Sequence, residues 1–238
     1  MAKLTKRAKQ IKAVKEQFPA EVDAKFAIET LQKFIKDSAS KNTNQTFEIS
    51  VQLGIDTKAN DQQVRSSVVL PSGTGKKTRI AVIAKGEKVQ QAKEAGADFA
   101  GTEDLVQKIQ DGWMDFDVLV ATPDTMPLLG KLGRVLGPRG LMPNPKDGTV
   151  TADVAKAVKD LQAGKVTFRA EKTGAVVHMP IGKSAFSVEE VYANLLAAIQ
   201  EIRKNKPSSS KGTYMESVFL SVTQGPGLKL DQNTIVAA

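Results

Sequence analysis

The chain has 238 residues, 41% hydrophobic and 25% charged, enough to bury the core of one large domain or two small ones. It contains no cysteine, which excludes disulfides and thiolate metal sites. The formal net charge is +8, from 34 Lys and Arg against 26 Asp and Glu, and this balance favours a polyanionic partner such as nucleic acid.

The first predicted element is a basic helix over residues 3–17, which ends before Pro19 because the residue before a proline disfavours the α region. This segment has no continuous apolar stretch, so it is not a secretory signal. No stretch of the chain approaches the roughly 20 apolar residues that a membrane-spanning helix needs. We therefore expect a cytoplasmic protein, or one of an organelle such as a plastid, without a membrane partner.

The next elements form an α+β pattern. Asp23 is expected to cap a second helix, which carries apolar residues at helical spacing between positions 27 and 35. Apolar and polar residues then alternate over residues 47–53, which predicts a strand with one buried face.

The middle of the chain has a different rhythm. The apolar stretch at residues 79–84 predicts a strand that is buried on both faces. Further elements are expected in the order helix, strand, helix, strand, at residues 86–95, 97–100, 102–110 and 116–121, with Thr102 as a helix cap. Strands that alternate with helices pair in parallel through right-handed crossovers.

The last third returns to the first pattern. Its predicted elements are a helix at 152–163, strands at 166–169 and 175–181, a helix at 187–202 capped by Ser187, and a strand at 218–222. A turn at Lys172, Thr173 and Gly174 joins the first two strands, and a short tail is expected after Gly225-Pro226-Gly227.

These elements predict a mixed fold, α/β and α+β. Neither outer part of the chain is expected to bury a sheet face alone. We therefore expect a discontinuous two-layer α+β domain made of residues 1–67 and 160–238. An inserted three-layer Rossmann-like parallel α/β domain is expected at residues 68–159, with two chain crossings that act as a hinge.

The glycine-rich segments do not match nucleotide-binding motifs. Around Gly73-Thr74-Gly75-Lys76, a phosphate-binding loop would need glycine at Leu70 and a hydroxyl at Lys77. A dinucleotide fingerprint would need glycine at Thr78. An enzyme built on the α/β domain would carry a glycine loop after its first strand, where this chain has Lys85-Gly86-Glu87. We expect no catalytic residue and no cofactor.

The only histidine, His178, lies on a predicted strand and is expected to be structural, so we expect no metal site. The basic segment at residues 131–146, KLGRVLGPRGLMPNPK, offers Arg134 and Arg139 as planar donors to phosphate. The alternative is a stiff surface loop that packs on the α/β domain, and both interpretations stay open.

The aromatic content also bears on the partner. Nine Phe, two Tyr and one Trp are too few for an array of base-stacking platforms, which favours a folded RNA over unstructured single strands. The basic N-terminal helix is a candidate DNA recognition helix, so a DNA-binding regulator remains an alternative.

Four segments carry a resemblance that covers the whole chain. They are LPSGTGK at 70–76, DGWMDFDVLVATPD at 111–124, KLGRVLGPRGLMPNPK at 131–146 and KTGAVVHMPIGK at 172–183, with support from LGID at 53–56. In these segments the chain resembles the bacterial type of the family of large ribosomal subunit protein one, the protein of the mobile stalk beside the tRNA exit site.

The resemblance implies a non-enzymatic, RNA-binding ribosomal protein. Its first domain would bind large-subunit (23S) rRNA, and its second would project outward among other large-subunit components. The family assists release of tRNA from the exit site. In bacteria it also represses translation of its own operon by binding a similar fold in the mRNA.

The resemblance also implies site residues, which are expected along one edge of the first domain. The rRNA-binding positions are Thr46, Glu171, Lys172, Thr173, Gly174, Ser217, Thr223, Gln224 and Gly225. Arg134 and Arg139 are candidates for a contact with tRNA or a second RNA.

Two positions depart from the family pattern. This chain has Gln224 where the family usually has methionine, and Thr43 where it usually has phenylalanine. Each change replaces apolar surface with a polar group at the expected contact. Each either weakens binding by about 1 kcal/mol or is offset by new hydrogen bonds.

Overall fold

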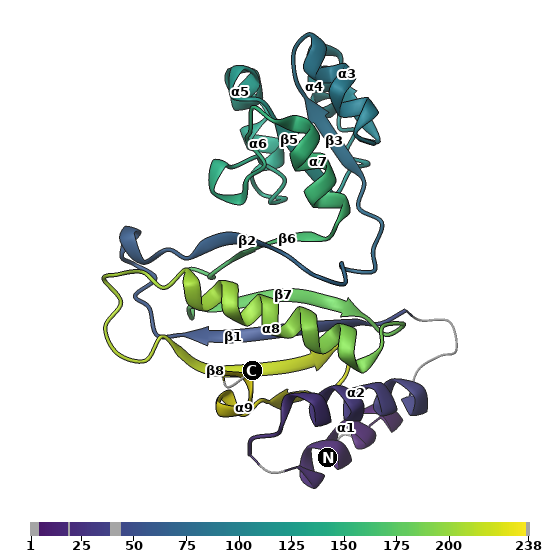
Figure 1. Ribbon diagram of the computed structural model, residues 1–238, viewed down its shortest axis with the longest axis vertical. Coiled ribbons are helices and arrows are strands. Elements are labelled where there is room, and N and C mark those ends of the chain that lie inside the picture. The colour runs from purple at the N-terminus through teal and green to yellow at the C-terminus, as the bar shows by residue number, and fades with distance from the viewer. Residues whose placement is uncertain (1–4, 19, 39–43, 237–238) are drawn as a thin grey trace. The chain divides into compact units, whose positions relative to one another are not determined.

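The computed structural model describes residues 5–18, 20–38 and 44–236, and the chain divides into two compact units (Figure 1). Unit 1 comprises residues 1–75 and 166–238, and unit 2 comprises residues 76–165. These junctions lie a few residues beyond 67/68 and 159/160. The difference arises because Val68 and Leu70 are buried in the core of unit 1, whereas Leu161 is buried in unit 2.

The main sheet of unit 1 joins strands from distant parts of the sequence. Its antiparallel order is β7 (Val176–Lys183), β1 (Thr46–Leu53), β8 (Met215–Val222) and β9 (Gly227–Lys229). The predicted alternation in β1 is confirmed, since Phe47, Ile49 and Val51 are fully buried. Strand β1 therefore lies between two strands from the last third of the chain.

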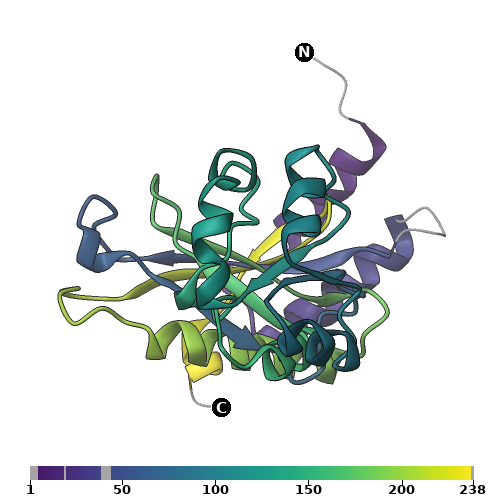
Figure 2. The same cartoon turned by 90° about the horizontal axis from the view of Figure 1, so that it is seen from above.

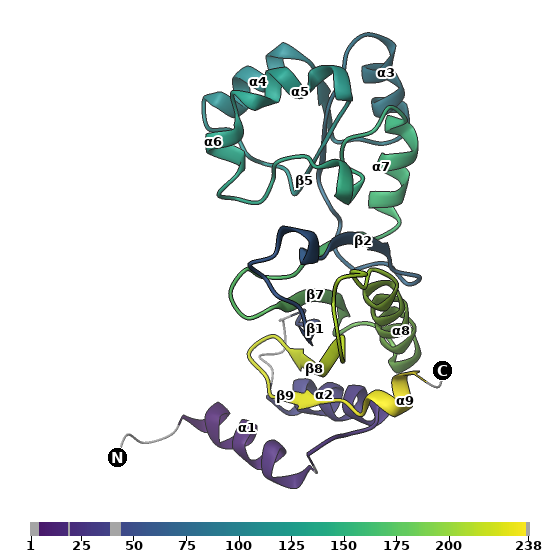
Figure 3. The same cartoon turned by 90° about the vertical axis from the view of Figure 1, so that its left-hand side faces the viewer.

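Two helices cover one face of this sheet. Helix α2 (Ala24–Ser38) and helix α8 (Val188–Lys204) share the hydrophobic core with the inward residues of the strands, and Figure 3 shows α8 on one side of the sheet. Both predicted caps are confirmed. Asp23 Oδ1 accepts from the backbone N–H groups of Lys25 and Phe26, and Ser187 forms a capping box with Glu190. Hydrogen bonds from the Ser187 backbone and hydroxyl lower the pKa of Glu190.

The N-terminal helix and the last segment differ in detail from the prediction. Helix α1 (Lys6–Gln17) begins after Thr5, whose hydroxyl accepts from Ala8 N, while residues 3 and 4 lie outside the described part. The expected tail was wrong, because the chain turns back after β8 to form β9 and then α9 (Gln232–Val236). Leu228 and Leu230 anchor this return in the core.

A second strand, besides β9, was not predicted. Strand β2 (Arg65–Val69) pairs with β6 (Lys165–Arg169) in a separate two-stranded sheet. Its sequence, RSSVV, has neither a clean alternation nor a continuous apolar stretch, so no hydrophobic pattern marks it.

Unit 2 contains the predicted parallel sheet, in the order β4 (Phe99–Gly101), β3 (Ile80–Ile83) and β5 (Val118–Ala121). All four residues of β3 are buried, and its alternate side chains enter two different hydrophobic clusters. Helices pack on both faces of the sheet. They include α3 (Glu87–Glu94) and α7 (Val154–Gln162) on one face and α4 (Glu103–Gln110) on the other.

Thr102 occupies the position before α4, but its side chain does not cap the helix. The hydroxyl instead donates to the backbone oxygen of Ala84, at 2.8 Å, and so joins the chain after β4 to the end of β3.

Among the described residues, no helix is both long enough and apolar enough to cross a membrane.

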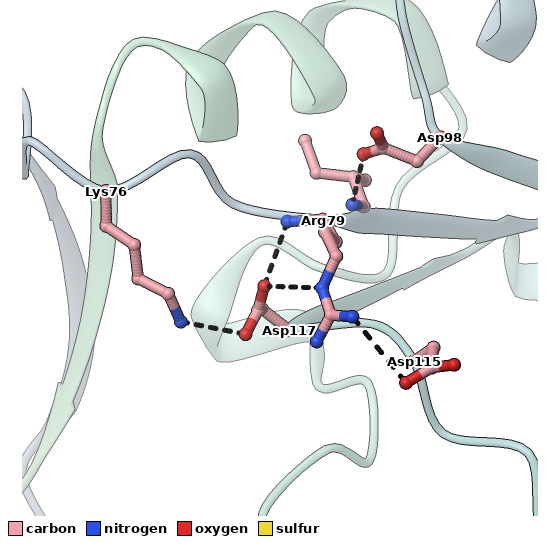
Figure 4. A network of polar contacts seen from close by, with 6 residues as sticks. Lys76, Arg79, Asp98, Asp115 and Asp117 are labelled. Carbon is pink, nitrogen blue, oxygen red and sulfur yellow. Dashed lines mark hydrogen bonds and ion pairs between the residues drawn. The ribbon is translucent and has the colours of Figure 1, made fainter.

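A polar network secures the first residues of unit 2 to the start of β5 (Figure 4). Asp117 accepts from Lys76 Nζ at 2.8 Å, from Arg79 N at 3.0 Å and from Arg79 Nε at 3.4 Å. Asp98 accepts from Ile80 N at 2.9 Å. The hydrogen bond from Lys76 is the main reason why the pKa of Asp117 falls from 3.8 to about 2.

This network predicts an acid-dependent loss of stability. Because the folded-state pKa is depressed, ionised Asp117 stabilises the fold above pH 4, and the contribution disappears as pH falls from about 4 to 2. In urea unfolding, Asp117→Asn is expected to lower the unfolding free energy by about 1–2 kcal/mol at pH 6, after allowance for partial solvent screening. The two proteins should converge near pH 2, and a difference independent of pH would contradict the assignment.

Candidate RNA-binding site

The face of the unit 1 sheet that points away from α2 and α8 is mostly polar. We call it the open face; its residues are all exposed or half-buried and belong to β1, β7 and β8. They are Thr46, Glu48, Ser50, Gln52, Val176, His178, Pro180, Ser217, Phe219 and Ser221. The strand registers align them in rows, so that Ser50 lies between His178 and Phe219.

The predicted residues Thr46 and Thr223 meet at one end of this face. The Thr223 hydroxyl accepts from Thr46 N at 3.0 Å and lies 3.3 Å from the Thr46 backbone oxygen, to which it donates. Lys183 Nζ donates to Thr46 Oγ1 at 2.7 Å. With Gln224 and Gly225 these three residues form what we call the Thr46 corner, where hydroxyls, an ammonium group and a turn lie together.

The turn in the Thr46 corner has a demanding backbone. Gln224 adopts φ = +56°, a left-handed conformation that is rare for residues other than glycine. A Cβ on Gly225 would lie 2.3 Å from Cγ1 of Val222, so a larger residue is excluded unless the turn moves. Gln224 is exposed, and Thr43, the second departure from the family, lies outside the described residues.

The other predicted residues lie at the opposite end of the open face. Gln52 Nε2 donates to the backbone oxygen of Gly174 at 2.7 Å, and Gln52 lies opposite Ser217 in the strand register. The exposed turn at residues 171–174 lines two surface hollows, of about 450 and 650 Å³. The cationic residues that line them are Lys58, Arg65, Arg169, Lys172 and Lys211.

The expectation of a single edge is therefore corrected: the predicted residues occupy two ends of one strand face. Thr46 and Gln52 are six residues apart on β1, which corresponds to about 20 Å. Because β7 and β8 run antiparallel to β1, β7 begins near Gln52 and β8 ends near Thr46. The turns that precede β7 and follow β8 must therefore lie at opposite ends.

The residues between these ends were not identified as site residues from the sequence. Ser50 Oγ and His178 Nδ1 are hydrogen-bonded at 2.9 Å, and the Phe219 side chain is 38% exposed. The alternation of each strand could have indicated them. Where the apolar residues of a strand face the helices, the residues between them must face outward.

The chemistry of the open face suits a folded RNA better than a small molecule. Its centre offers hydroxyl and imidazole groups, one carboxylate, Glu48, and the exposed ring of Phe219, while the Gln52 amide and the cations lie toward the ends. Hydroxyl and amide groups exchange hydrogen bonds with ribose 2′-hydroxyls and base edges. Lysine and arginine neutralise phosphates.

The candidates for a second RNA contact, Arg134 and Arg139, lie in unit 2. The segment is not the simple loop that was expected, because α6 (Gly133–Leu136) forms a helical turn within it. Leu132 and Leu136 are fully buried and anchor the segment to unit 2, while both arginines are exposed. The segment at residues 131–146 thus packs on unit 2 and at the same time exposes two cations, so the two interpretations are compatible.

The described residues contain no group of three or more His, Asp or Glu side chains placed to hold a metal ion. His178 contacts Ser50 on the open face. The loop around Gly73 lies before β3, and its Ser72 N and Gly73 O are hydrogen-bonded to the buried side chain of Asn194. That loop is therefore part of the packing of unit 1.

Comparison with known proteins assigns the chain to a family. The model of the "Ribosomal protein L1p/L10e family" matches residues 31–226. Proteins named "Large ribosomal subunit protein uL1" from Burkholderia vietnamiensis and Burkholderia ambifaria are 49% and 50% identical over 239 residues, and one from Herminiimonas arsenicoxydans is 50% identical over 237 residues. Each comparison covers 100% of both chains. The chain therefore belongs to the ribosomal protein L1p/L10e family and is a structural, non-enzymatic constituent of the large ribosomal subunit.

Proposed function

We propose that unit 1 binds large-subunit (23S) rRNA along the open face, with the Thr46 corner and the turn at residues 171–174 as its two ends. The observation that carries the proposal is the mostly polar surface of one sheet, with cations at both of its ends. A length of about 20 Å spans several nucleotides of a folded RNA. The sheet holds the contacting groups in fixed register, which lowers the entropic cost of binding.

Binding is expected to be tight and sensitive to salt, because cations at both ends displace counterions from the phosphates. If about three to five phosphates are neutralised, raising the salt concentration from 50 to 200 mM weakens binding by roughly 40- to 500-fold. Filter binding to a folded fragment of stalk rRNA at several salt concentrations measures this slope. An affinity that is indifferent to salt would contradict the proposal.

The alternative of a DNA-binding regulator is separated by competition. Excess duplex DNA of the same length should leave the rRNA complex largely intact, because the open face offers partners for 2′-hydroxyl groups that DNA lacks. Equal competition by duplex DNA would show that only non-specific phosphate binding is present.

The two compact units support a proposal for the architecture. We infer that unit 1 is the discontinuous two-layer rRNA-binding domain and that unit 2 is an inserted three-layer Rossmann-like domain. In this arrangement unit 2 contacts exit-site tRNA through Arg134 and Arg139 and assists its release. Loss of tRNA crosslinking in ribosomes that carry the double alanine variant would support this role, and unchanged crosslinking would count against it.

The open face also suits a similar fold in the messenger of the protein's own operon, which we propose as the basis of translational repression. rRNA and messenger fragments should then compete for one site, and simultaneous binding of both would contradict this. The proposed location is the cytoplasmic ribosome, in contact with other components of the large subunit.

A further inference from the structure

The N-terminal helix is hydrogen-bonded directly to the Thr46 corner. Arg7 Nε donates to the backbone oxygen of Gln224 at 2.9 Å, and Arg7 Nη2 donates to that of Thr223 at 3.3 Å. The guanidinium carbon also lies 5.8 Å from the centre of the Phe34 ring. Two donors and one face of this guanidinium group are therefore engaged within the protein.

Arg7 belongs to the face of α1 that points inward. Arg7, Ile11, Val14 and Phe18 recur at intervals of three and four residues, and the three apolar members pack against the core of unit 1. Lys9 is exposed on the same helix. Arg7 therefore points toward the protein, whereas Lys9 points toward solvent, where a cation can contact a phosphate.

The position of α1 places this contact at the border of the open face. In Figures 2 and 3, α1 lies on the side of the sheet away from α8, beside the segment that joins β8 to β9. The carbonyl groups that Arg7 engages belong to the turn in which Gln224 has φ = +56°. A non-glycine residue in this conformation is about 1–2 kcal/mol less stable than in the right-handed region, so the turn depends on contacts that stabilise it.

We propose that Arg7 is a positioning residue for RNA binding, which holds the Thr223–Gln224 turn in its binding conformation. Its positive charge also offsets the partial negative charge of the two carbonyl oxygens, which would otherwise repel an approaching phosphate. This inference rests on the proposed function, and it assigns to α1 a role other than direct contact with the nucleic acid. The guanidinium acts through the turn, because its Nε and Nη2 edge donates to the two carbonyls.

Three variants with one folded rRNA fragment test the proposal. Arg7→Gln is expected to weaken binding about tenfold. The dependence of log affinity on log salt concentration should keep its slope, since no phosphate contact is lost. Arg7→Lys keeps the charge but lacks the planar fork, so it should lose nearly as much. Lys9→Gln removes the same charge from the exposed side of α1 and should change affinity less than about twofold.

Hydrogen exchange in the free protein gives a second readout, independent of RNA. The Gly225 amide donates to the backbone oxygen of Val222 at 2.7 Å and reports on the turn. Its exchange should accelerate in Arg7→Gln and Arg7→Lys but not in Lys9→Gln.

The outcomes separate this proposal from the proposed function. A slope that falls by about one in Arg7→Gln, with full recovery in Arg7→Lys, would make Arg7 a direct phosphate contact and overturn the positioning role. Unchanged affinity and exchange in Arg7→Gln would overturn it as well. A wild-type protein that does not bind the fragment would instead overturn the proposed function, while the exchange rates would still decide whether Arg7 holds the turn.

Discussion

Thr223→Ala is expected to weaken binding to a folded rRNA fragment by about ten- to a hundredfold. The Thr223 hydroxyl accepts from Thr46 N and donates to Thr46 O, and so joins the end of β8 to the start of β1 at the Thr46 corner. Its loss leaves Thr46 N without this acceptor where the RNA is expected to bind, at a cost of about 1–3 kcal/mol, whereas Thr46 O still accepts from Thr223 N at 3.0 Å. Filter binding at a fixed salt concentration measures the change.

Two variants serve as controls for this result. Thr223→Ser keeps the hydroxyl and should bind almost as well as the wild type. Arg134→Ala removes an exposed cation of unit 2 and should cost less than about threefold. If Arg134→Ala weakened rRNA binding more than Thr223→Ala, the main rRNA contact would lie on unit 2.

Asn194→Ala is expected to lower the unfolding free energy of the protein by about 3 kcal/mol. Asn194 is fully buried on α8, and Nδ2 donates to Ile181 O at 2.7 Å and to Gly73 O at 2.9 Å. Its Oδ1 accepts from Ser72 N at 3.0 Å. The variant leaves three backbone groups without these partners and a cavity in their place, and urea unfolding at pH 7 measures the loss.

Asn205→Ala is the matched control, because it removes the same side chain from the C-terminal end of the same helix. Asn205 is half-buried, and among the described residues its side chain bonds to Glu201 alone, so we expect a loss below about 1 kcal/mol. Equal losses for the two variants would show that the bonds to the loop at residues 72–73 contribute little to stability.

The parts of the fold that sequence patterns predicted are those in which burial alone determines the pattern. Strand β1 buries one face and alternates, whereas β3 buries both faces and is apolar throughout. Asp23 and Ser187 indicated where two helices begin, because the first N–H groups of a helix need an acceptor and these side chains supply one. These signals are local, so they can be read without knowledge of the partner elements.

The elements that were missed depend on distant partners. Strand β2 exists through its pairing with β6, and β9 through its return along β8, and neither carries a hydrophobic pattern of its own. The Thr102 hydroxyl likewise depends on a distant partner. It donates to the carbonyl of Ala84 and does not cap α4, because β3 lies beside β4.

The candidate site shows the same division. Thr46 and Thr223 were identified through resemblance, but their hydrogen bonds join residues 177 positions apart. That the turn at residues 171–174 lies at the other end follows from the antiparallel register. The roles of Ser50, His178 and Phe219 required the alignment of three strands, and Arg7 required the packing of α1.

The most direct test is site-specific crosslinking in assembled large subunits. A photoreactive residue placed at Phe219, in the centre of the open face, should crosslink to the rRNA of the stalk, and one placed at Arg134 should give little or no crosslink to it. Crosslinks from Arg134 alone, with Phe219 unreactive in subunits that contain the protein, would contradict the assignment of rRNA binding to the open face of unit 1.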